Sequence, residues 1–454
     1  MGRPRAAQCA CHRRPGGGPD RGAGGVRIPV HLPLAALALA LAAGATRAED
    51  LLQVWAQARA ADPVLRQAAA FSGAQEAAAR EARAALLPQW SVQASEQREN
   101  GDGGRTRSVT SSLSQPLFDL AALRTWDASR AQASAESARL AAAEQAARAR
   151  VAEAYFGLLS AQAQLATARD NEEAFARQVS EADTRFKAGL SAQVEADQSR
   201  AYRELARGNT LAAELAVADA REALAQLTGT APIQLQPLRR DLQAQPLPDS
   251  ADAWAERALQ GNPVLRGLAL DVEASEQRIS AARAGHLPTL SMGVDTTQRR
   301  GDGVSAIDAG RTPTLIGLRL TVPLFAGGAV AAATDRASFQ REAAREQLEA
   351  GRRAVLREVR AQVLAVGQGQ AQLRATQVAV QAAERALEAT RTGLTLGTRS
   401  TTDLLLAIQT LASAQNAQTQ ARHRHVLALL ALHQAAGSLG DAELAAVNAL
   451  LETR

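Results

Sequence analysis

Two parts of the chain alternate apolar and polar residues with a period of two, the pattern of a strand with one apolar face. Between 289 and 323, Leu290, Met292 and Val294 alternate with polar or small residues, and the series resumes at Ile316. The part between 89 and 116 has a weaker version. Each part predicts two strands of about ten residues, a length that suits a tilted membrane-spanning strand. Four prolines are expected at strand ends, where they remove no ladder hydrogen bond: Pro88, Pro116, Pro288 and Pro323.

A long proline-free stretch with helical periodicity follows each strand pair, at about 119–187 and 328–395. Apolar residues recur every seven positions in the second stretch: Val359, Val366, Leu373, Val380, Leu387 and Leu394. The first stretch has the same column with one break, at Glu172. This spacing predicts closely packed coiled-coil helices, each roughly 100 Å long at 1.5 Å per residue. A return helix is expected at 192–226 and again at 403–436.

The strand pairs and the long helices each occur twice because the chain contains an internal duplication. The sequence DPVLR at 62–66 recurs as NPVLR at 262–266, and later landmarks keep their order in both halves. The chain therefore divides into nine parts. These are a leader (1–48), helices (49–88), two strands (89–116), a long helix with turn and return helix (117–229), a linker (230–252), the same three parts again (253–288, 289–323, 324–437) and a C-terminal segment (438–454).

The leader has the features of a secretory signal peptide. A short apolar run at 32–43 follows Arg27, and small residues stand at −3 and −1 of a cleavage site after Ala48. Residues 1–25 are long for such a segment, so Val26 is an alternative start. Seven arginines and both cysteines lie in the leader, and the rest of the chain has 44 basic and 45 acidic residues. Net charge therefore gives no reason to expect a nucleic-acid partner.

Four amphipathic strands cannot close a barrel, and open strand edges would leave backbone groups unpaired in lipid. Closed bacterial barrels have at least about eight strands. Three copies of this chain would supply twelve, so the sequence predicts an oligomer. After the leader no stretch of about 18 apolar residues remains that could form a transmembrane helix.

The chain resembles the TolC family of outer-membrane ducts. The motifs that carry the resemblance are GHLPTL (285–290), VPLFAGG (322–328), GTRSTTD (397–403) and FKAGL (186–190). It implies an α+β membrane protein, a homotrimer with a twelve-stranded outer-membrane β-barrel continued by an α-helical coiled-coil barrel in the periplasm of a Gram-negative cell. The segments 230–252 and 438–454 would form an equatorial belt. No cysteine stands at the cleavage site, which resembles the non-lipoprotein branch.

The resemblance also implies the function. The protein would be the exit duct of a tripartite export system, without a cofactor, working with a periplasmic adaptor and an inner-membrane ABC or RND transporter. Its surroundings would include outer-membrane lipid. Drugs or secreted proteins would pass through it, and a dedicated type I outlet for secreted toxins is the alternative.

The candidate site lies at the two helix turns, which the glycines Gly189 and Gly397 are expected to form. By resemblance, Arg399 and Glu195 form a gate latch between neighbouring helix pairs. Asp403 would contribute to a ring of carboxylates at the pore constriction, where such a ring favours cations. The sequence Ser400-x-x-Asp403 also fits a capping box, and both roles can hold. A second acidic position of the family is Leu406 here, which weakens the expected cation block.

Other chemistry is not indicated. The sequence has no phosphate loop, nucleophile elbow or HExxH motif, so we expect no enzyme and no catalytic residues. His423, His425 and His433 lie on one predicted helix, and packing is favoured over a metal site. A non-transporting periplasmic coiled-coil scaffold is the structural alternative. The alternating strands argue against it.

Overall fold

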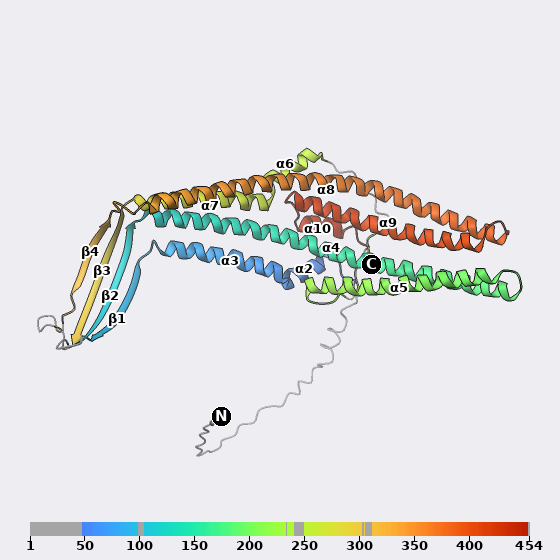
Figure 1. Ribbon diagram of the computed structural model, residues 1–454, viewed down its shortest axis with the longest axis horizontal. Coiled ribbons are helices and arrows are strands. Elements are labelled where there is room, and N and C mark those ends of the chain that lie inside the picture. Colours follow the sequence, from blue (N-terminus) through green and yellow to red (C-terminus); the bar gives the residue numbers. More distant parts are fainter. Residues whose placement is uncertain are drawn as a thin grey trace, which may run out of the picture. The chain divides into compact units, whose positions relative to one another are not determined.

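The computed structural model describes residues 48–98, 104–232, 234–239, 249–301, 304 and 311–452. Most of this unit consists of long helices, and four strands lie at one end of it (Figure 1). The predicted leader lies outside the described residues except for Ala48. Within the described part, no helix is both long and apolar enough to cross a membrane.

The strands form one antiparallel sheet in the order β1-β2-β3-β4. Their bounds are Gln89–Arg98 for β1, Arg105–Phe118 for β2, Thr289–Gly301 for β3 and Thr314–Thr321 for β4. The two predicted strand pairs are therefore confirmed, and β2 pairs with β3 to join the two repeats in one sheet. Strands β1 and β4 are the edges of this sheet, and each has one side unpaired within the chain.

The register places most of the apolar residues of the four strands on one face. Trp90 lies opposite Leu113, Leu113 opposite Val294, and Val294 opposite Ile316. The same face carries further apolar residues: Val92, Ala94, Val109, Leu290, Met292, Leu318 and Leu320. The other face carries mainly hydroxyl and amide side chains: Ser91, Gln93, Ser95, Ser108, Thr110, Ser112, Ser114, Ser291 and Thr297. Such a division suits a sheet with lipid on one side and water on the other.

Pro116 does not end a strand, contrary to the prediction from the sequence. It lies inside β2, opposite Ser291, and the register shifts between Pro116 and Phe118. Proline has no N–H to donate to the ladder, and a β-bulge accommodates this loss while the strand continues. The strand therefore extends two residues beyond the proline, as far as Phe118.

The helices that precede the two strand pairs, α3 and α7, each begin at an N-cap residue followed by proline. The bounds are Pro63–Ala84 for α3 and Pro263–Arg283 for α7. Asp62 accepts a hydrogen bond from the Val64 N–H at 2.9 Å, and Asn262 accepts one from the Val264 N–H at 2.8 Å. Proline at the first helical position has no N–H to leave unpaired. The repeated DPV and NPV sequences are thus the N-terminal caps of equivalent helices.

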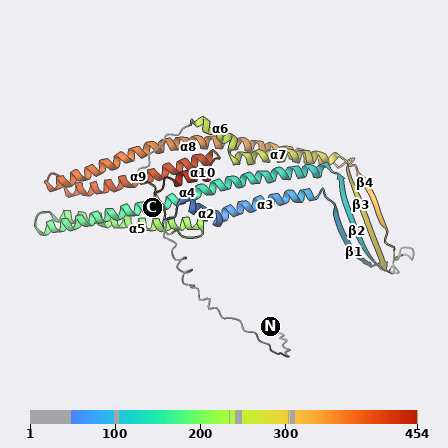
Figure 2. The ribbon, with the colours of Figure 1, turned by 180° about the vertical axis from the view of Figure 1, so that it is seen from behind.

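The long helices continue the strands in the same order. Helices α3, α4, α7 and α8 lie side by side as do β1, β2, β3 and β4 (Figures 1 and 2). The bounds are Leu120–Lys187 for α4 and Ala329–Thr395 for α8, and the return helices are α5 (Gln193–Thr228) and α9 (Thr401–Ala435). Each return helix packs against its own long helix, and α4 also packs against α9.

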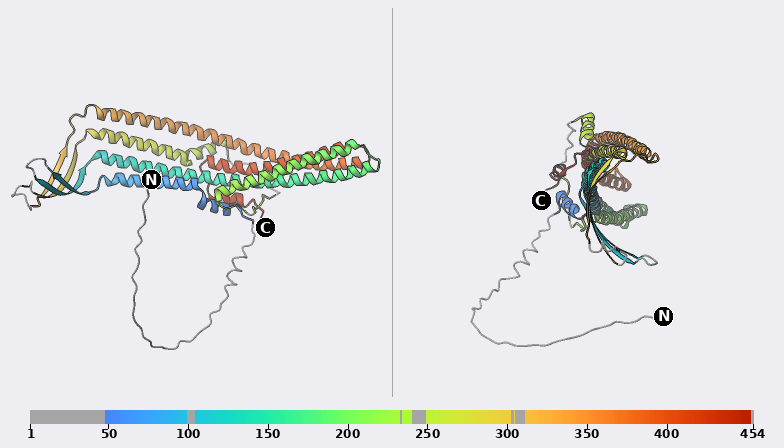
Figure 3. Two further views of the ribbon diagram at one scale, coloured as in Figure 1. Left: turned by 60° about the horizontal axis from the view of Figure 1, so that its bottom comes forward. Right: turned by 90° about the vertical axis from the view of Figure 1, so that its left-hand side faces the viewer.

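The predicted heptad column is largely the packed seam. Val359, Val366, Leu373, Val380 and Leu387 are buried, and Val151, Leu158 and Val179 are buried in the first repeat. The largest apolar cluster lies midway along the helices, around Tyr155 and Phe156, neither of which is exposed. The short helices α2 (Leu51–Ala61), α6 (Ala251–Gly261) and α10 (Asp441–Asn448) lie in this middle region (Figure 3). Isolated bridges join Glu49 to Leu235 and Leu238 to Leu451.

Candidate functional site

The first turn of the candidate site joins α4 to α5. Gly189 has a φ of 71°, a left-handed conformation that favours glycine. Its N–H donates to the Phe186 carbonyl at 2.9 Å, and the Leu190 N–H donates to the Arg185 carbonyl at 2.9 Å. This is a Schellman ending, which satisfies the last carbonyls of a helix and reverses the chain.

The second turn, between α8 and α9, has the same ending. Gly397 has a φ of 73°. Its N–H donates to the Leu394 carbonyl at 3.2 Å, and the Thr398 N–H donates to the Gly393 carbonyl at 2.8 Å. The structure therefore places both predicted turn glycines at equivalent positions, one at the end of each long hairpin.

Arg399 follows this turn, and its stem lies across helix α8. A Cβ atom at Gly393 would be only 2.6 Å from the Arg399 Cγ atom, so the absence of a side chain there makes room for the arginine. The Arg399 side chain is exposed, while Gly393 is buried beneath it. Gly393 was not among the residues predicted from the sequence, because a glycine within a helix gives no sign of what packs on it.

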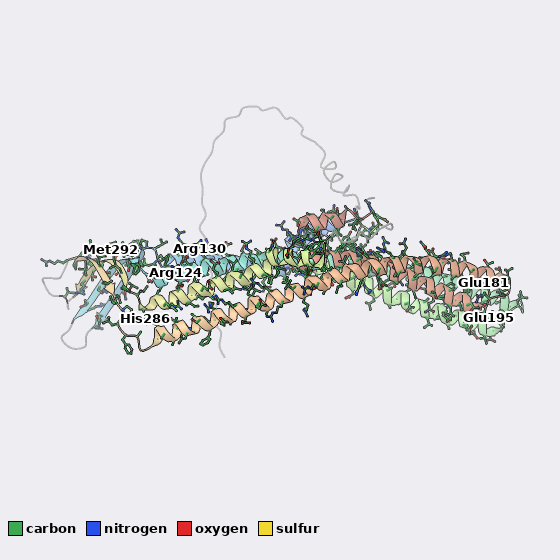
Figure 4. All side chains as sticks on the ribbon, turned by 90° about the horizontal axis from the view of Figure 1, so that it is seen from above. Arg124, Arg130, Glu181, Glu195, His286 and Met292 are labelled. Carbon is green, nitrogen blue, oxygen red and sulfur yellow. The ribbon has the colours of Figure 1, made fainter. Side chains whose placement is uncertain are left out.

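Glu195 contacts a threonine rather than the predicted arginine within one chain. The Thr401 hydroxyl donates to Glu195 Oε2 at 3.1 Å, and Thr401 is 9% exposed. Glu195 lies at the hairpin end, near Glu181 (Figure 4). In the described part of a single chain, no ion pair joins Arg399 to Glu195. The two latch residues therefore lie at the same end of the molecule but are not brought together by this chain alone.

A second polar contact joins the two hairpins. The Thr402 hydroxyl lies 3.1 Å from Gln198 Oε1, next to the Thr401–Glu195 contact. Sequence reasoning missed this pair, because it depends on how two hairpins about 200 residues apart pack. Beneath both contacts lies an apolar cluster that holds α9 in place: Phe175, Ala206, Leu387, Leu404, Leu405 and Ile408.

Asp403 has the capping role that the sequence allowed. Its N–H donates to the Ser400 Oγ at 3.2 Å, and the Ser400 N–H donates to Asp403 Oδ2 at 3.0 Å. These two bonds are a capping box at the start of α9. The backbone N–H of Ser400 lowers the pKa of the Asp403 carboxyl, and the positive charge of Arg399 adds to this. Asp403 is therefore a carboxylate at neutral pH, as a charged ring would need.

The histidines of α9 are packing residues. His423 Nδ1 lies 2.6 Å from the Ser160 Oγ, and His425 lies against Gly369. His433 meets the Trp254 ring edge-on, with 5.1 Å between ring centroids. Among the described residues, no group of three or more histidine, cysteine or acidic side chains could hold a metal ion.

Comparison with known proteins identifies relatives over most of the chain. The model of the outer membrane efflux protein family matches residues 54–230 and 254–438. Outer membrane protein TolC of Vibrio cholerae is 32% identical over 430 residues, which cover 93% of this chain and 98% of that protein. The alkaline protease secretion protein AprF of Pseudomonas aeruginosa is 32% identical over 344 residues, covering 75% of this chain and 71% of that protein.

Solved structures have the same fold at lower identity. The CmeC outer membrane channel of Campylobacter jejuni superposes with a TM-score of 0.77 at 20% identity, covering 90% of this chain and 91% of that one. The open state of the MtrE outer membrane channel of Neisseria gonorrhoeae gives a TM-score of 0.71 at 21% identity, covering 86% and 89%. The matches support the resemblance drawn from the motifs at 285–290, 322–328 and 397–403.

Proposed function

The chain belongs to the outer membrane efflux protein family, and from this premise we propose that its hairpin tips gate an exit duct for drugs or secreted proteins. The protein is an outer-membrane channel whose helices extend into the periplasm. Three four-stranded sheets close its barrel, and the helices continue it as a tunnel. The feature of this chain that best supports the proposal is the sheet, because its apolar face is continuous across four strands while both of its edges remain open.

The gate would lie at the turns of Gly189 and Gly397. We propose that Arg399 of one copy reaches Glu195 of the next, because Arg399 is exposed and forms no ion pair among the described residues of its own chain. Thr401 already holds Glu195 in place at 3.1 Å. Exposed ion pairs of this kind contribute about 0.2–1 kcal/mol each. Three weak pairs would close the entrance and still allow a partner protein to open it.

Asp403 would stand three times around the same entrance. Its carboxylate is fixed by the Ser400 N–H at 3.0 Å, so the capping box also holds its charge at a defined place. A ring of three fixed carboxylates attracts cations and opposes anions. The proposed gate thus combines a latch that sets how often the entrance opens with a ring that sets which ions enter.

The duct would receive its cargo from an inner-membrane pump through a periplasmic adaptor, and an ABC or RND transporter would supply the energy. Two relatives are named for the secretion of proteases, AprF and the PrtF protein of Dickeya chrysanthemi, which is 27% identical over 431 residues. These names favour a second candidate, a dedicated type I outlet for secreted proteins. It differs from the first in cargo and in the pump that it serves.

The test is to delete the gene and to supply it back in three forms. We expect the deletion strain to accumulate unrelated dyes and drugs and to lose secreted proteins, and the intact gene to restore both. Ile316→Arg should fail to restore, because arginine on the lipid face costs about 2–4 kcal/mol at the membrane midplane. Leu315→Arg is the matched control, because Leu315 lies opposite Asp295 on the polar face and should tolerate the charge.

The outcomes separate the two candidates. Loss of secreted proteins with normal drug accumulation would favour the dedicated outlet over the shared one. Normal accumulation and normal secretion in the deletion strain would contradict both. Equal restoration by Ile316→Arg and Leu315→Arg would contradict the assignment of the apolar face to lipid.

A further inference from the structure

The apolar face of the sheet ends in a cluster of arginines. Beyond the apolar residues, and on the same face, the strands carry Glu96, Arg98, Arg105, Arg107 and Arg300. This end of the sheet lies away from the helices (Figure 1). Because the helices extend into the periplasm, the cluster lies at the outer side of the membrane.

On the described strands, charge on this face is confined to that end. At the end near the helices, the same face carries Trp90, Phe118, Leu290 and Leu320. The arginines Arg299 and Arg319 belong to the opposite face, since they lie opposite Ser108 and Ser291. The lipid-facing surface of the described strands therefore has an apolar band with a basic patch at its outer edge alone.

The register makes this patch unfavourable unless an anion is present. Arg98 lies directly opposite Arg105, and Arg107 lies directly opposite Arg300. Like charges directly opposite one another destabilise a sheet. Glu96 is the one carboxylate on this face of the described strands, and it cannot balance four arginines.

Glu96 leaves the ends of the arginines available. Its Oε2 accepts from the Arg107 Nε at 2.8 Å, and its Oε1 accepts from the Arg105 Nε. The carboxylate thus contacts the Nε atoms, while each guanidinium keeps its two Nη groups for another acceptor. The side chains of Arg105 and Arg107 are 55% and 62% exposed, so they are open to such an acceptor.

We propose that Arg98, Arg105, Arg107 and Arg300 bind the phosphate groups of anionic lipid headgroups in the outer leaflet. Guanidinium groups bind phosphate oxygens in pairs and stay charged at all relevant pH values. The patch lies on the lipid-facing side, directly beyond the apolar band, which is the depth of the headgroups. The proposal rests on the outer-membrane location and is independent of the gate.

The experiment compares purified trimers in nanodiscs of phosphatidylcholine that contain a minor fraction of lipid A, a lipid with phosphate groups. Native mass spectrometry after detergent release measures how much lipid A each trimer retains. Arg98→Gln with Arg300→Gln removes two arginines that do not contact Glu96. At about 1 kcal/mol per basic residue near a charged membrane surface, retention should weaken roughly 30-fold. Arg299→Gln, one residue away on the opposite face, is the control and should retain lipid A as the wild type does.

Three results would overturn the proposal. Equal retention by the double variant and the wild type would show that the patch does not bind the headgroup. If wild-type trimers hold lipid A no better than phosphatidylcholine, other groups neutralise the arginines, and the loop carboxylates Glu99, Asp102 and Asp302 are the nearest in sequence. Displacement of lipid A by inorganic phosphate alone would identify a site for the free ion rather than for a lipid. Migration as a trimer on gels verifies that each variant is folded.

Discussion

At the scale of single residues, the hairpin tip depends on Gly393, a glycine that lies within helix α8 and not in the turn. Gly393 is helical, and its role is to leave space for the Arg399 stem, whose Cγ would lie 2.6 Å from an added Cβ. The stem of Arg399 therefore packs on α8 near the tip, and no ion pair within the described chain engages its guanidinium. An exposed arginine with a fixed stem is suited to reach a neighbouring copy.

We expect Arg399→Ala to raise the resting conductance of the trimer in a planar bilayer. Three latch pairs at about 0.2–1 kcal/mol each would change the ratio of closed to open channels roughly 3- to 150-fold. Arg391→Ala is the control, because Arg391 pairs with Glu388 at 2.7 Å on its own helix and lies in the last two turns of α8. A conductance that rises equally in both variants, or in neither, would contradict the latch.

Asp403→Asn should separate the capping role from the proposed ring. Asparagine keeps a side-chain oxygen that can accept from the Ser400 N–H, now at 3.0 Å, but it removes the charge. We therefore expect a smaller loss of thermal stability than in Asp403→Ala, together with weaker block of the conductance by Mg²⁺. Asp403→Ala removes both features and should also destabilise the start of α9. If Asp403→Asn and the wild type are blocked at the same Mg²⁺ concentration, Asp403 acts only as a cap.

At the scale of helices and strands, the sequence predicted what local patterns determine. The heptad column at Val359 to Leu387 predicted the buried seam, because side chains seven apart on a helix lie on one side. Period-two alternation predicted the strand pairs, because every second side chain of a strand lies on one face. Pro116 was misplaced, because a bulge can absorb a missing donor and the sequence does not show whether one forms.

The contacts between hairpins were beyond prediction from the sequence. Thr401 meets Glu195 and Thr402 meets Gln198 only because α9 packs beside α4 and α5. The local features of the site, which are the turn glycines Gly189 and Gly397 and the capping box, could be predicted because each lies within a few residues. The latch between copies needs a neighbouring chain, so it stays a proposal.

Helix α9 should make the tunnel sensitive to acid. Burial lowers the pKa of His423 to about 4, and the positive charge of Arg422 adds to this. Burial also lowers the pKa of His425 and of His433. In the unfolded chain the histidine pKa is near 6.5. Between about pH 4 and pH 6.5 the unfolded chain therefore binds a proton at His423 that the folded chain does not. The free energy of unfolding should therefore be highest above about pH 6.5 and fall as the pH decreases toward 4.

Thermal unfolding followed by circular dichroism of the helices measures this effect. A single histidine shifted from about 6.5 to about 4 would cost the folded state roughly 3 kcal/mol at pH 4. His423→Gln can still hydrogen-bond Ser160 but does not titrate, so its loss of stability over this pH range should be smaller. A variant that loses as much stability as the wild type would exclude His423 as a source of the acid sensitivity.

At the scale of the whole molecule, the fold is complete only as a trimer. Strands β1 and β4 each have one unpaired side, and the apolar face ends at both edges with its backbone groups unsatisfied. Lipid offers no hydrogen bonds, so β1 of one copy must pair with β4 of the next. Within one chain β1 and β4 are separated by two strands, which places them about 14 Å apart at 4.7–4.9 Å per strand. A disulfide needs Cα atoms about 4.4–6.8 Å apart and cannot form between them.

Paired cysteines in β1 and β4 should therefore cross-link different copies and yield a covalent trimer on a denaturing gel. Both native cysteines, Cys9 and Cys11, lie in the predicted leader, so the wild type is the blank. Val92→Cys belongs to the apolar face and should cross-link with one of the same-face positions of β4, which are Thr314, Ile316, Leu318 and Leu320. Cysteine at Leu315 or Gly317 points to the opposite face and is the matched control. Cross-linking that ignores this alternation, or that gives no species beyond a dimer, would be incompatible with a barrel closed by three copies.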